Sequence, residues 1–227
     1  FRSIRSTSVM LAGKNFVVAG HGHCGSGVAK RASGMGSNVI ITEVKATAAI
    51  KAVLEGFEVK TMDDAAKVGD IFCTATGMKD IIRKRHFEVM KDGAIVCNTG
   101  HYDCEINISE LEEIAVSKRT IRQNCEEFTL KDGRRIFVLA EGRLVNLAAA
   151  EGHPSEVMDM SFANQFLCHV KLVEAHRSGT SLPVEVIDIP VEQDEYIAEL
   201  KLNTMGLSMD ILTQEQIDYA NNYLEGT

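Results

Sequence analysis

A short hydrophobic strand that runs directly into a glycine-rich turn constrains the fold of this chain more than any other feature. Asn15-Phe-Val-Val-Ala is followed by Gly20-His-Gly22-His-Cys-Gly25 and then by a helix-like run from Val28. In a G-x-G-x-x-G turn the first glycine permits the tight bend, the second lets a pyrophosphate approach the backbone, and the third lets the helix pack against the sheet. The helix N-terminus adds unpaired N–H groups and a partial positive charge. The pattern predicts a dinucleotide site, with a purely structural glycine turn as the alternative.

An acidic residue ends the next hydrophobic run. Asn38-Val-Ile-Ile-Thr-Glu43 is typical of a second strand, and it places Glu43 where a carboxylate accepts hydrogen bonds from the ribose hydroxyls of a dinucleotide. A carboxylate repels a 2′-phosphate, so this charge favours NAD over NADP. Lys45 weakens the argument, because a cation beside the strand end could pair with that phosphate. We expect NAD as the cofactor.

Strand-like and helix-like segments alternate from residue 15 to about residue 100, which is typical of βαβ units with a parallel sheet. Strands are predicted at 15–20, 38–43, 58–60, 70–75 and 94–99, and helices at 23–35, 46–55, 62–68 and 84–91. A helix from Ser109 and two strands, at 120–122 and 135–140 around a turn at 131–133, extend the pattern. The predicted fold class is α/β, a Rossmann-type doubly wound parallel sheet over residues 13–153 with a helical C-terminal extension.

The two ends of the chain do not continue the alternation of strands and helices. Residues 1–12 are interpreted as the end of an inter-domain helix. After Gly152-His-Pro154, helical patterns cover 155–176, 191–205 and 213–224. Their apolar faces are expected to pack on another domain or subunit, so 154–227 forms a separate segment in this interpretation.

Composition and charge exclude several classes of protein. A net charge of -8, with no cluster of Lys and Arg, argues against nucleic acid and anionic membranes as partners. No apolar stretch is long enough to span a bilayer. The 6 cysteines show no zinc-type spacing, which favours a reducing compartment, and a cytoplasmic location is expected by default. His21 and His23 lack a third ligand, so no metal site is predicted.

Two Thr-Gly turns follow predicted strands, at Thr76-Gly77 and Thr99-Gly100. In a doubly wound sheet the ligand lies beyond the carboxyl ends of the strands, so both turns are predicted to line the cofactor. His101 follows the second turn, where an imidazole would project toward the nicotinamide and can move protons near neutral pH. A surface histidine without a catalytic role is the alternative.

Other polar residues carry weaker signals. His153 lies between Gly152 and Pro154, which suits a hinge residue reaching into a cleft, and a structural role is equally open. Asn146 either places an amide on the cofactor or is a buried structural residue. Less specific expectations are that Asp63-Asp64 lie in a helix first turn, that Glu126-Glu127 are solvent-exposed, and that His86, His169 and His176 lie in solvent or on a helix face.

Longer segments carry a resemblance to a known family. They include Gly100-His-Tyr-Asp-Cys-Glu-Ile106, Leu139-Ala-Glu-Gly-Arg-Leu-Val-Asn146, Glu151-Gly-His-Pro-Ser155 and Ser161-Phe-Ala-Asn-Gln165, together with residues 12–14, 18–22, 41–43, 74–77, 86–87, 90–95, 132–135 and 157–158. The chain resembles the cofactor domain and C-terminal part of S-adenosylhomocysteine hydrolase (adenosylhomocysteinase). The match covers essentially the whole chain.

The resemblance implies a mechanism and a site. In that family a tightly held NAD oxidises the adenosine 3′-hydroxyl, homocysteine is eliminated, water adds, and the cofactor returns its hydride, so that the net reaction is reversible hydrolysis to adenosine and homocysteine. By matching position, His101 and His153 also face the nucleoside and are the expected catalytic residues. The full expected NAD contacts are Gly20, Gly22, His23, Cys24, Gly25, Ser26, Gly27, Glu43, Thr76, Thr99, Gly100, His101, Asn146 and His153.

Departures from the family pattern put the affinity for NAD in question. Ser26 replaces a common Lys in the glycine loop, Lys45-Ala46 replaces an Asp-Pro pair, and Ala48 replaces a polar residue. The C-terminus, 223–227, lacks the basic, Tyr-rich tail by which many members reach a neighbouring subunit's NAD.

The largest departure is a missing part of the family pattern. The Lys, Asp and Glu that perform acid–base work belong to an N-terminal substrate domain that would precede Phe1. The chain is therefore expected to be an NAD-binding fragment, inactive alone, that acts on S-adenosylhomocysteine together with that domain and assembles as a homo-oligomer, a tetramer in the family. The choice between adenosine and inosine stays open.

Two other functions remain as alternatives. A stand-alone homologue could use NAD(H) for regulation or assembly without hydrolase activity. A 2-hydroxyacid-dehydrogenase-like oxidoreductase would share the general fold, but the run from residue 142 to residue 165 argues against it.

Overall fold

The computed structural model describes residues 7–220 and 222. The chain divides into two compact units, one up to Gly152 and one from His153. The helix end expected at 1–12 lies largely outside the described residues, and within them residue 7 is helical while 9–11 have no regular structure. The C-terminal segment 223–227 also lies outside them. Within the described residues, none of the helices is both long and apolar enough to cross a membrane.

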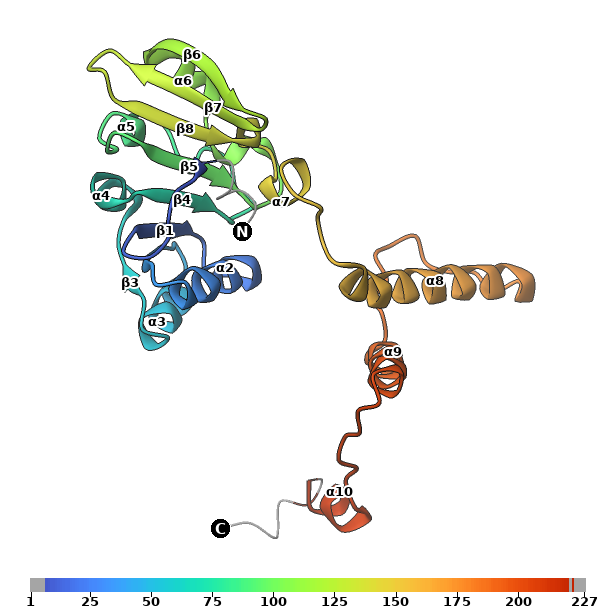
Figure 1. Ribbon diagram of the computed structural model, residues 1–227. Helices are drawn as coiled ribbons and strands as arrows, with labels where there is room; N and C mark the ends of the chain where they lie inside the picture. The colour runs from blue at the N-terminus through green and yellow to red at the C-terminus, as the bar shows by residue number, and fades with distance from the viewer. Residues whose placement is uncertain (1–6, 221, 223–227) are drawn as a thin grey trace. The chain divides into compact units, whose positions relative to one another are not determined.

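The first unit begins with alternating strands and helices (Figure 1). Its elements are β1 Asn15–Ala19, α2 His23–Gly34, β2 Asn38–Thr42, α3 Ala46–Leu54, β3 Glu58–Val59, α4 Met62–Val68, β4 Ile71–Thr74, α5 Lys84–Phe87 and β5 Ala94–Asn98. They are followed by η1 Asp103–Glu105, α6 Ile108–Ile114, β6 Ala115–Arg122, β7 Cys125–Leu130, β8 Arg135–Leu139, η2 Ala140–Gly142 and α7 Val145–Ala148.

The strands form one 8-stranded sheet in the order β3-β2-β1-β4-β5-β8-β7-β6. The first six positions are parallel, which is the doubly wound arrangement with its switch point between β1 and β4. The predicted Rossmann-type fold is therefore confirmed. The sheet ends differently from the prediction, because β7 pairs antiparallel with both β8 and β6.

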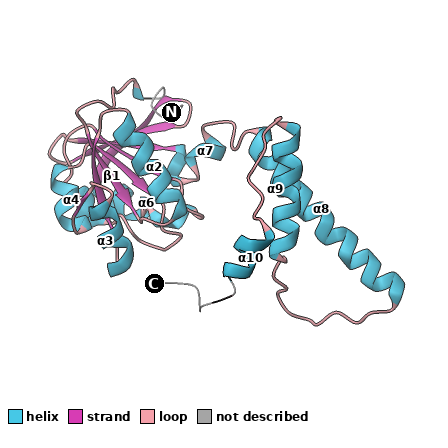
Figure 2. Cartoon of the chain, turned by 90° about the horizontal axis from the view of Figure 1, so that it is seen from below, coloured by secondary structure: helices cyan, strands magenta, loops and turns pink. Residues whose placement is uncertain are grey.

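Helices cover both faces of the sheet (Figure 2). One buried cluster packs alternate strand residues, such as Val17 and Phe72, against side chains of α4, α5 and α6. The other packs the opposite faces of the same strands, such as Val18 and Cys73, against α2, α3 and α7. Strands buried on both faces read as continuous apolar runs, which explains why the parallel strands were visible in the sequence.

Strand β7 was not predicted from the sequence, and the prediction that its two glutamates are solvent-exposed was wrong for Glu127. In the segment Cys-Glu-Glu-Phe-Thr-Leu four residues are buried and two are partly buried, whereas its two adjacent carboxylates had led us to predict solvent exposure. Glu127 is in fact buried, with 4% of its surface exposed, and its Oε1 accepts a hydrogen bond from Nε of Arg119 on β6 at 2.6 Å. The charge is tolerated because a cross-strand guanidinium pairs with it.

The second unit is helical, with α8 Ser155–Ser178, α9 Val191–Thr204 and α10 Gln214–Ala220. Helix α8 ends at Gly179, whose φ of 70° is left-handed. Polar contacts join α8 to α9, among them Asn164 Nδ2 to Asp194 at 2.8 Å and Lys201 Nζ to Asp159 at 2.9 Å. Large apolar side chains remain exposed on the unit, including Phe162, Phe166, Val184, Val186 and Ile211.

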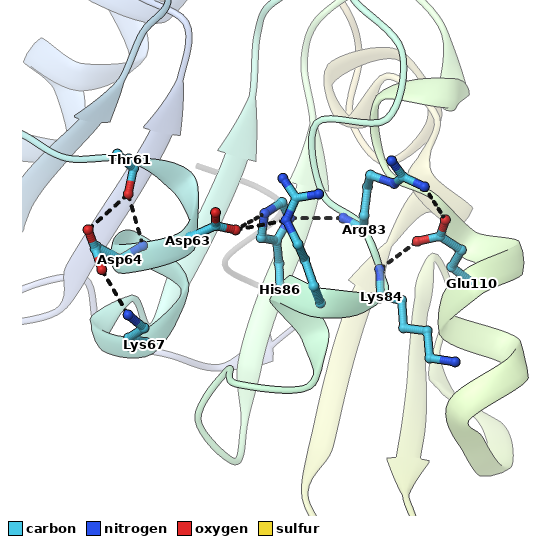
Figure 3. A network of polar contacts seen from close by, with 9 residues as sticks. Thr61, Asp63, Asp64, Lys67, Arg83, Lys84, His86 and Glu110 are labelled. Carbon is cyan, nitrogen blue, oxygen red and sulfur yellow. Dashed lines mark hydrogen bonds and ion pairs between the residues drawn. The ribbon is translucent and has the colours of Figure 1, made fainter.

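A polar network holds α4, α5 and α6 together (Figure 3). Asp63 and Asp64 lie in the first turn of α4, as predicted. His86 lies on a helix, α5, but the alternative that it lies in solvent was wrong, because only 1% of its surface is exposed. Its Nδ1 accepts a hydrogen bond from the Arg83 N–H at 3.0 Å, and its Nε2 lies 2.9 Å from Asp63 Oδ1. Nε2–H therefore donates, and the ring is neutral.

We expect the cost of His86→Asn in unfolding free energy to be about 1–3 kcal/mol at pH 7.5 and to shrink toward pH 5. Burial lowers the pKa of His86 from 6.5, and the Arg85 charge adds to this effect against the opposing Asp63 carboxylate. The unfolded imidazole takes up a proton as the pH falls through 6.5, whereas the folded one resists, so the stabilisation is lost below that value.

Urea unfolding of both proteins across this pH range measures the difference. His169→Asn is the matched control, because His169 is exposed on α8 and its replacement should cost little at either pH. A cost for His86→Asn that is the same at pH 7.5 and pH 5 would contradict the neutral, hydrogen-bonded ring.

Candidate cofactor site

The glycine turn joins β1 to α2 with very little space between them. Gly20 has a φ of +93°, and a Cβ there would lie 2.9 Å from the Ala75 carbonyl oxygen. A Cβ on Gly25 would lie only 1.9 Å from the carbonyl oxygen of Gly20, which is the close helix packing predicted for the third glycine. Gly22 caps the helix with a φ of -76°, and a Cβ on Gly22 or Gly27 would meet no atom within 4 Å. The turn is closed toward the protein and open on its outer side.

Three more predicted residues lie at the start of α2. His23 and Cys24 are exposed and Ser26 is partly buried. The Ser26 hydroxyl donates to the His23 carbonyl at 3.2 Å, so it is engaged within the helix. The first-turn N–H groups of α2 remain available to an anion, as expected for a helix N-terminus.

Glu43 follows β2, and its carboxylate accepts hydrogen bonds from backbone N–H groups. One carboxylate oxygen accepts from the His21 N–H at 2.7 Å, and the other accepts from the Val44 and Lys45 N–H groups at 2.7 and 3.0 Å. Partial burial alone would raise the pKa of Glu43, but the N–H bonds from Lys45, His21 and Val44 and the Lys45 charge together lower it. The group is an ionised acceptor beside the glycine turn, and about one of its acceptor sites, on the oxygen that binds the His21 N–H, is left for a hydroxyl donor.

His21, inside the glycine turn, is buried. Its Nε2 lies 3.1 Å from Glu55 Oε2, and Lys30 lies 3.2 Å from the other oxygen of Glu55. The Nδ1 atom of His21 is buried and has no hydrogen-bond partner among the described residues. The imidazole therefore ties the turn to the end of α3 and faces Phe57 edge-on, with ring centroids 5.9 Å apart.

The two Thr-Gly turns lie side by side at the carboxyl ends of β4 and β5. The Thr99 N–H donates to the Thr74 carbonyl at 2.8 Å. Asn98, which has no exposed surface, accepts from the Thr74 hydroxyl and the Gly100 N–H at 3.1 and 2.7 Å. Its amide donates to the carbonyls of Tyr102 and Gly142. This buried side chain joins both turns to the segment that follows β8.

Two residues at these turns were missed by sequence reasoning. Asn98 ends an apolar strand, which is a detectable signal, since a buried amide there must find partners. Glu105 lies in η1 and has no exposed surface, and its carboxylate binds the backbone of the β4 turn. A single glutamate in a polar stretch gave no signal of burial, because acids are rarely buried.

Asn146 lies on α7, which the chain reaches through a left-handed turn. Ala140, Glu141 and Gly142 have φ values of 53°, 56° and 79°, and a bridge between Asn98 and Leu144 sets the approach to β5. The Oδ1 atom of Asn146 is buried and has no hydrogen-bond partner among the described residues. A buried acceptor without a donor costs free energy, so a ligand donor would fit this position.

The structure brings most of the predicted residues to one edge of the sheet. Gly20 to Gly27, Glu43, Thr76, Thr99, Gly100, His101 and Asn146 all follow the carboxyl ends of β1, β2, β4, β5 or β8. His101 is exposed, and its ring contacts Tyr102 edge-on at a centroid distance of 4.0 Å. His153 belongs to the second unit, and its role stays a prediction.

The arrangement suits a dinucleotide. Helix α2 offers N–H groups and an uncrowded backbone at Gly22 and Gly27, which fits a pyrophosphate. Glu43 offers an ionised acceptor for ribose hydroxyls, and Asn146 offers an unpaired acceptor on the other side of β1. These groups, which are chemically suited to an anion, a sugar hydroxyl and an amide, lie along one edge of the sheet.

Comparisons with known proteins identify the family. The family model described as S-adenosyl-L-homocysteine hydrolase, NAD binding domain, matches residues 3–152. An adenosylhomocysteinase of Aquifex aeolicus is 55% identical over 224 residues, covering 99% of this chain and 53% of that protein. An S-inosyl-L-homocysteine hydrolase of Methanococcus maripaludis is 53% identical and is likewise covered over 53% of its length. The chain thus spans about half the length of these curated relatives, and it belongs to the S-adenosyl-L-homocysteine hydrolase family, whose NAD-binding domain it carries.

Proposed function

We propose that this chain is the NAD-binding part of an enzyme that reversibly hydrolyses an S-nucleosyl-L-homocysteine to the nucleoside and L-homocysteine. The observation that carries the proposal is the relationship to adenosylhomocysteinases over 99% of the chain. Bound NAD would accept a hydride from the substrate ribose and return it. An S-inosyl-L-homocysteine hydrolase is nearly as similar, so the proposal includes both adenine and hypoxanthine as the base of the nucleoside.

The residues of this chain would bind and orient the cofactor. The N–H groups at the start of α2, with Gly22 and Gly27, would hold the pyrophosphate, and Glu43 would accept hydrogen bonds from the adenosine ribose. The buried Oδ1 atom of Asn146 would accept a hydrogen bond from the cofactor. These roles follow from unpaired or ionised groups at one sheet edge.

Protons at the substrate would be handled by histidine. His101 is exposed just beyond β5, where an imidazole can hold or transfer a proton near neutral pH. His153 would be the second proton-transferring histidine, as the family resemblance implies. We infer that the exposed apolar side chains of the second unit become buried there against a substrate domain and other subunits.

The test separates cofactor binding from turnover. Residues 1–227 alone are expected to bind NAD, seen by calorimetry and by mass spectrometry of retained cofactor, and to release no homocysteine from S-adenosyl- or S-inosyl-L-homocysteine. Joining the chain to the remaining half of the Aquifex aeolicus adenosylhomocysteinase is expected to create hydrolysis of one of these substrates, measured by free thiol release.

Two results would contradict the proposal. The first is turnover by residues 1–227 alone, since it would place the acid–base groups within this chain. The second is a chimera that folds, retains NAD and cleaves neither substrate. The same chimera with Glu43→Ala is the control for cofactor dependence, and light scattering of the chimera reports its assembly.

A further inference from the structure

Glu105 is a buried carboxylate whose hydrogen-bond partners all donate. Oε2 accepts from the Thr76 N–H at 3.0 Å and the Thr76 hydroxyl at 2.8 Å. Oε1 accepts from the Gly77 N–H at 2.8 Å and, more weakly, from the His101 N–H at 3.4 Å. An ionised carboxylate accepts hydrogen bonds and donates none, so a set made up only of donors matches its hydrogen-bonding capacity. The side chain has no exposed surface.

The neighbouring backbone is shaped around this carboxylate. An ideal Cβ on Gly100 would lie 1.5 Å from Glu105 Oε1 and 2.5 Å from its carboxyl carbon. Only glycine therefore fits at position 100 while Glu105 keeps its place. The carboxylate contacts the turns after both β4 and β5, and it fixes their separation through charge-assisted hydrogen bonds.

The position of Glu105 in the sheet indicates which half of the cofactor would lie near it. In a doubly wound sheet a dinucleotide spans the switch point between its two mononucleotide-binding halves. The β1 turn and Glu43 lie on the half that would hold the adenosine and pyrophosphate. The turns held by Glu105 follow β4 and β5, on the other side of the switch point, so they would face the nicotinamide half.

We propose that Glu105 is a positioning residue that holds the two turns facing the nicotinamide and that its fixed negative charge favours oxidised NAD over NADH. The oxidised ring carries a positive charge and the reduced ring does not. A buried charge is screened little by solvent or salt, so its attraction for the oxidised ring persists over several ångströms. The inference rests on the proposed NAD site and does not depend on hydrolase activity.

The test compares the affinities of residues 1–227 for NAD and NADH by calorimetry and nucleotide fluorescence. Glu105→Gln removes the charge with little change in size, and we expect it to raise the Kd for NAD about tenfold more than the Kd for NADH. Gly100→Ala is the matched control, since its Cβ displaces the carboxylate without removing its charge. We expect Gly100→Ala to weaken both forms and to change the ratio of the two Kd values less than Glu105→Gln does, because the charge is retained.

A second control changes the hydrogen bonds alone. Thr76→Val removes one donor to Glu105 and should also weaken both forms similarly. An unchanged ratio of the two Kd values in folded Glu105→Gln would overturn the inference. If Glu105→Gln does not fold, the ratio of the Kd values of the wild-type protein for NAD and NADH is the test. Tighter binding of NADH than of NAD by the wild type would also overturn the inference. Wild-type protein that binds neither form would instead refute the proposed cofactor site.

Discussion

Glu43→Ala is expected to lower the affinity of the chain for NAD by about 10- to 100-fold. A hydrogen bond between a charged group and a ligand contributes about 1.5–3 kcal/mol, and the carboxylate has about one acceptor site left for a ribose hydroxyl. The substitution also removes the acceptor for the His21 N–H, so the backbone of the glycine turn loses this hydrogen bond while the His21 ring stays paired with Glu55. Calorimetric titration with NAD measures the loss.

The pH dependence of NAD binding provides a second measurement on the same residue. The N–H bonds from Lys45, His21 and Val44 outweigh the effect of burial and lower the pKa of Glu43 below 4.5. The carboxylate therefore stays ionised down to pH values below 4.5, and its contribution to NAD affinity should be constant from pH 8 to pH 5. A loss of affinity in the wild type over this range that Glu43→Ala abolishes would contradict this assignment.

Glu88→Ala is the matched control for Glu43→Ala. Glu88 is exposed at the end of α5, so its removal changes the net charge by the same amount without touching the sheet edge. It should leave the affinity for NAD unchanged. Equal affinities of wild type and Glu43→Ala for NAD would refute the assignment of Glu43 to the ribose. Equal losses of affinity in Glu43→Ala and Glu88→Ala would show that the loss comes from the change in net charge.

The parallel half of the fold was predictable because its signals are local. Each of β1, β2, β4 and β5 is an apolar run buried on both faces, and each is followed by a glycine or by polar residues. The antiparallel β7 was missed because Glu126 and Glu127 interrupt its hydrophobic pattern. What makes Glu127 compatible with burial is Arg119 on the neighbouring strand, and that pairing depends on register, which a single segment does not reveal.

In the candidate site, too, the residues with local sequence signals were predictable and those that depend on distant contacts were not. The position of the glycine turn, Glu43 and both Thr-Gly turns at the strand ends was predictable from spacing, because a strand end and a turn lie next to each other in sequence. Asn98 and Glu105 were not found, since their roles depend on contacts with Gly142, 44 residues away, and with Thr76, 29 residues away. Burial of His21 and His86 was missed for the same reason, as their carboxylate partners come from other elements.

Gly25→Ala is expected to destabilise the first unit by about 3 kcal/mol, and its NAD binding should fall with the folded population. A Cβ at this position would overlap the Gly20 carbonyl oxygen at 1.9 Å, and that atom is backbone, so no side chain can rotate away. Relief requires α2 to move from β1. Such a movement would open the cluster in which Ala29 and Ala32 pack against Val18. Urea unfolding measures the change in stability.

Gly22, the N-cap of α2, and Gly34, its last residue, separate folding from binding. Gly22→Ala meets no atom of the protein within 4 Å and has an ordinary φ of -76°, so stability should be nearly unchanged. Its methyl group points to the open side of the turn, where it should weaken NAD binding at least about tenfold because the pyrophosphate approaches there. Gly34→Ala also meets no atom within 4 Å, so it should leave NAD binding unchanged and raise stability by up to about 1 kcal/mol through the higher helix propensity of alanine. A Gly25→Ala protein as stable as wild type would disprove the close approach of α2 to β1, and a Gly22→Ala protein with wild-type affinity would exclude the pyrophosphate from this turn.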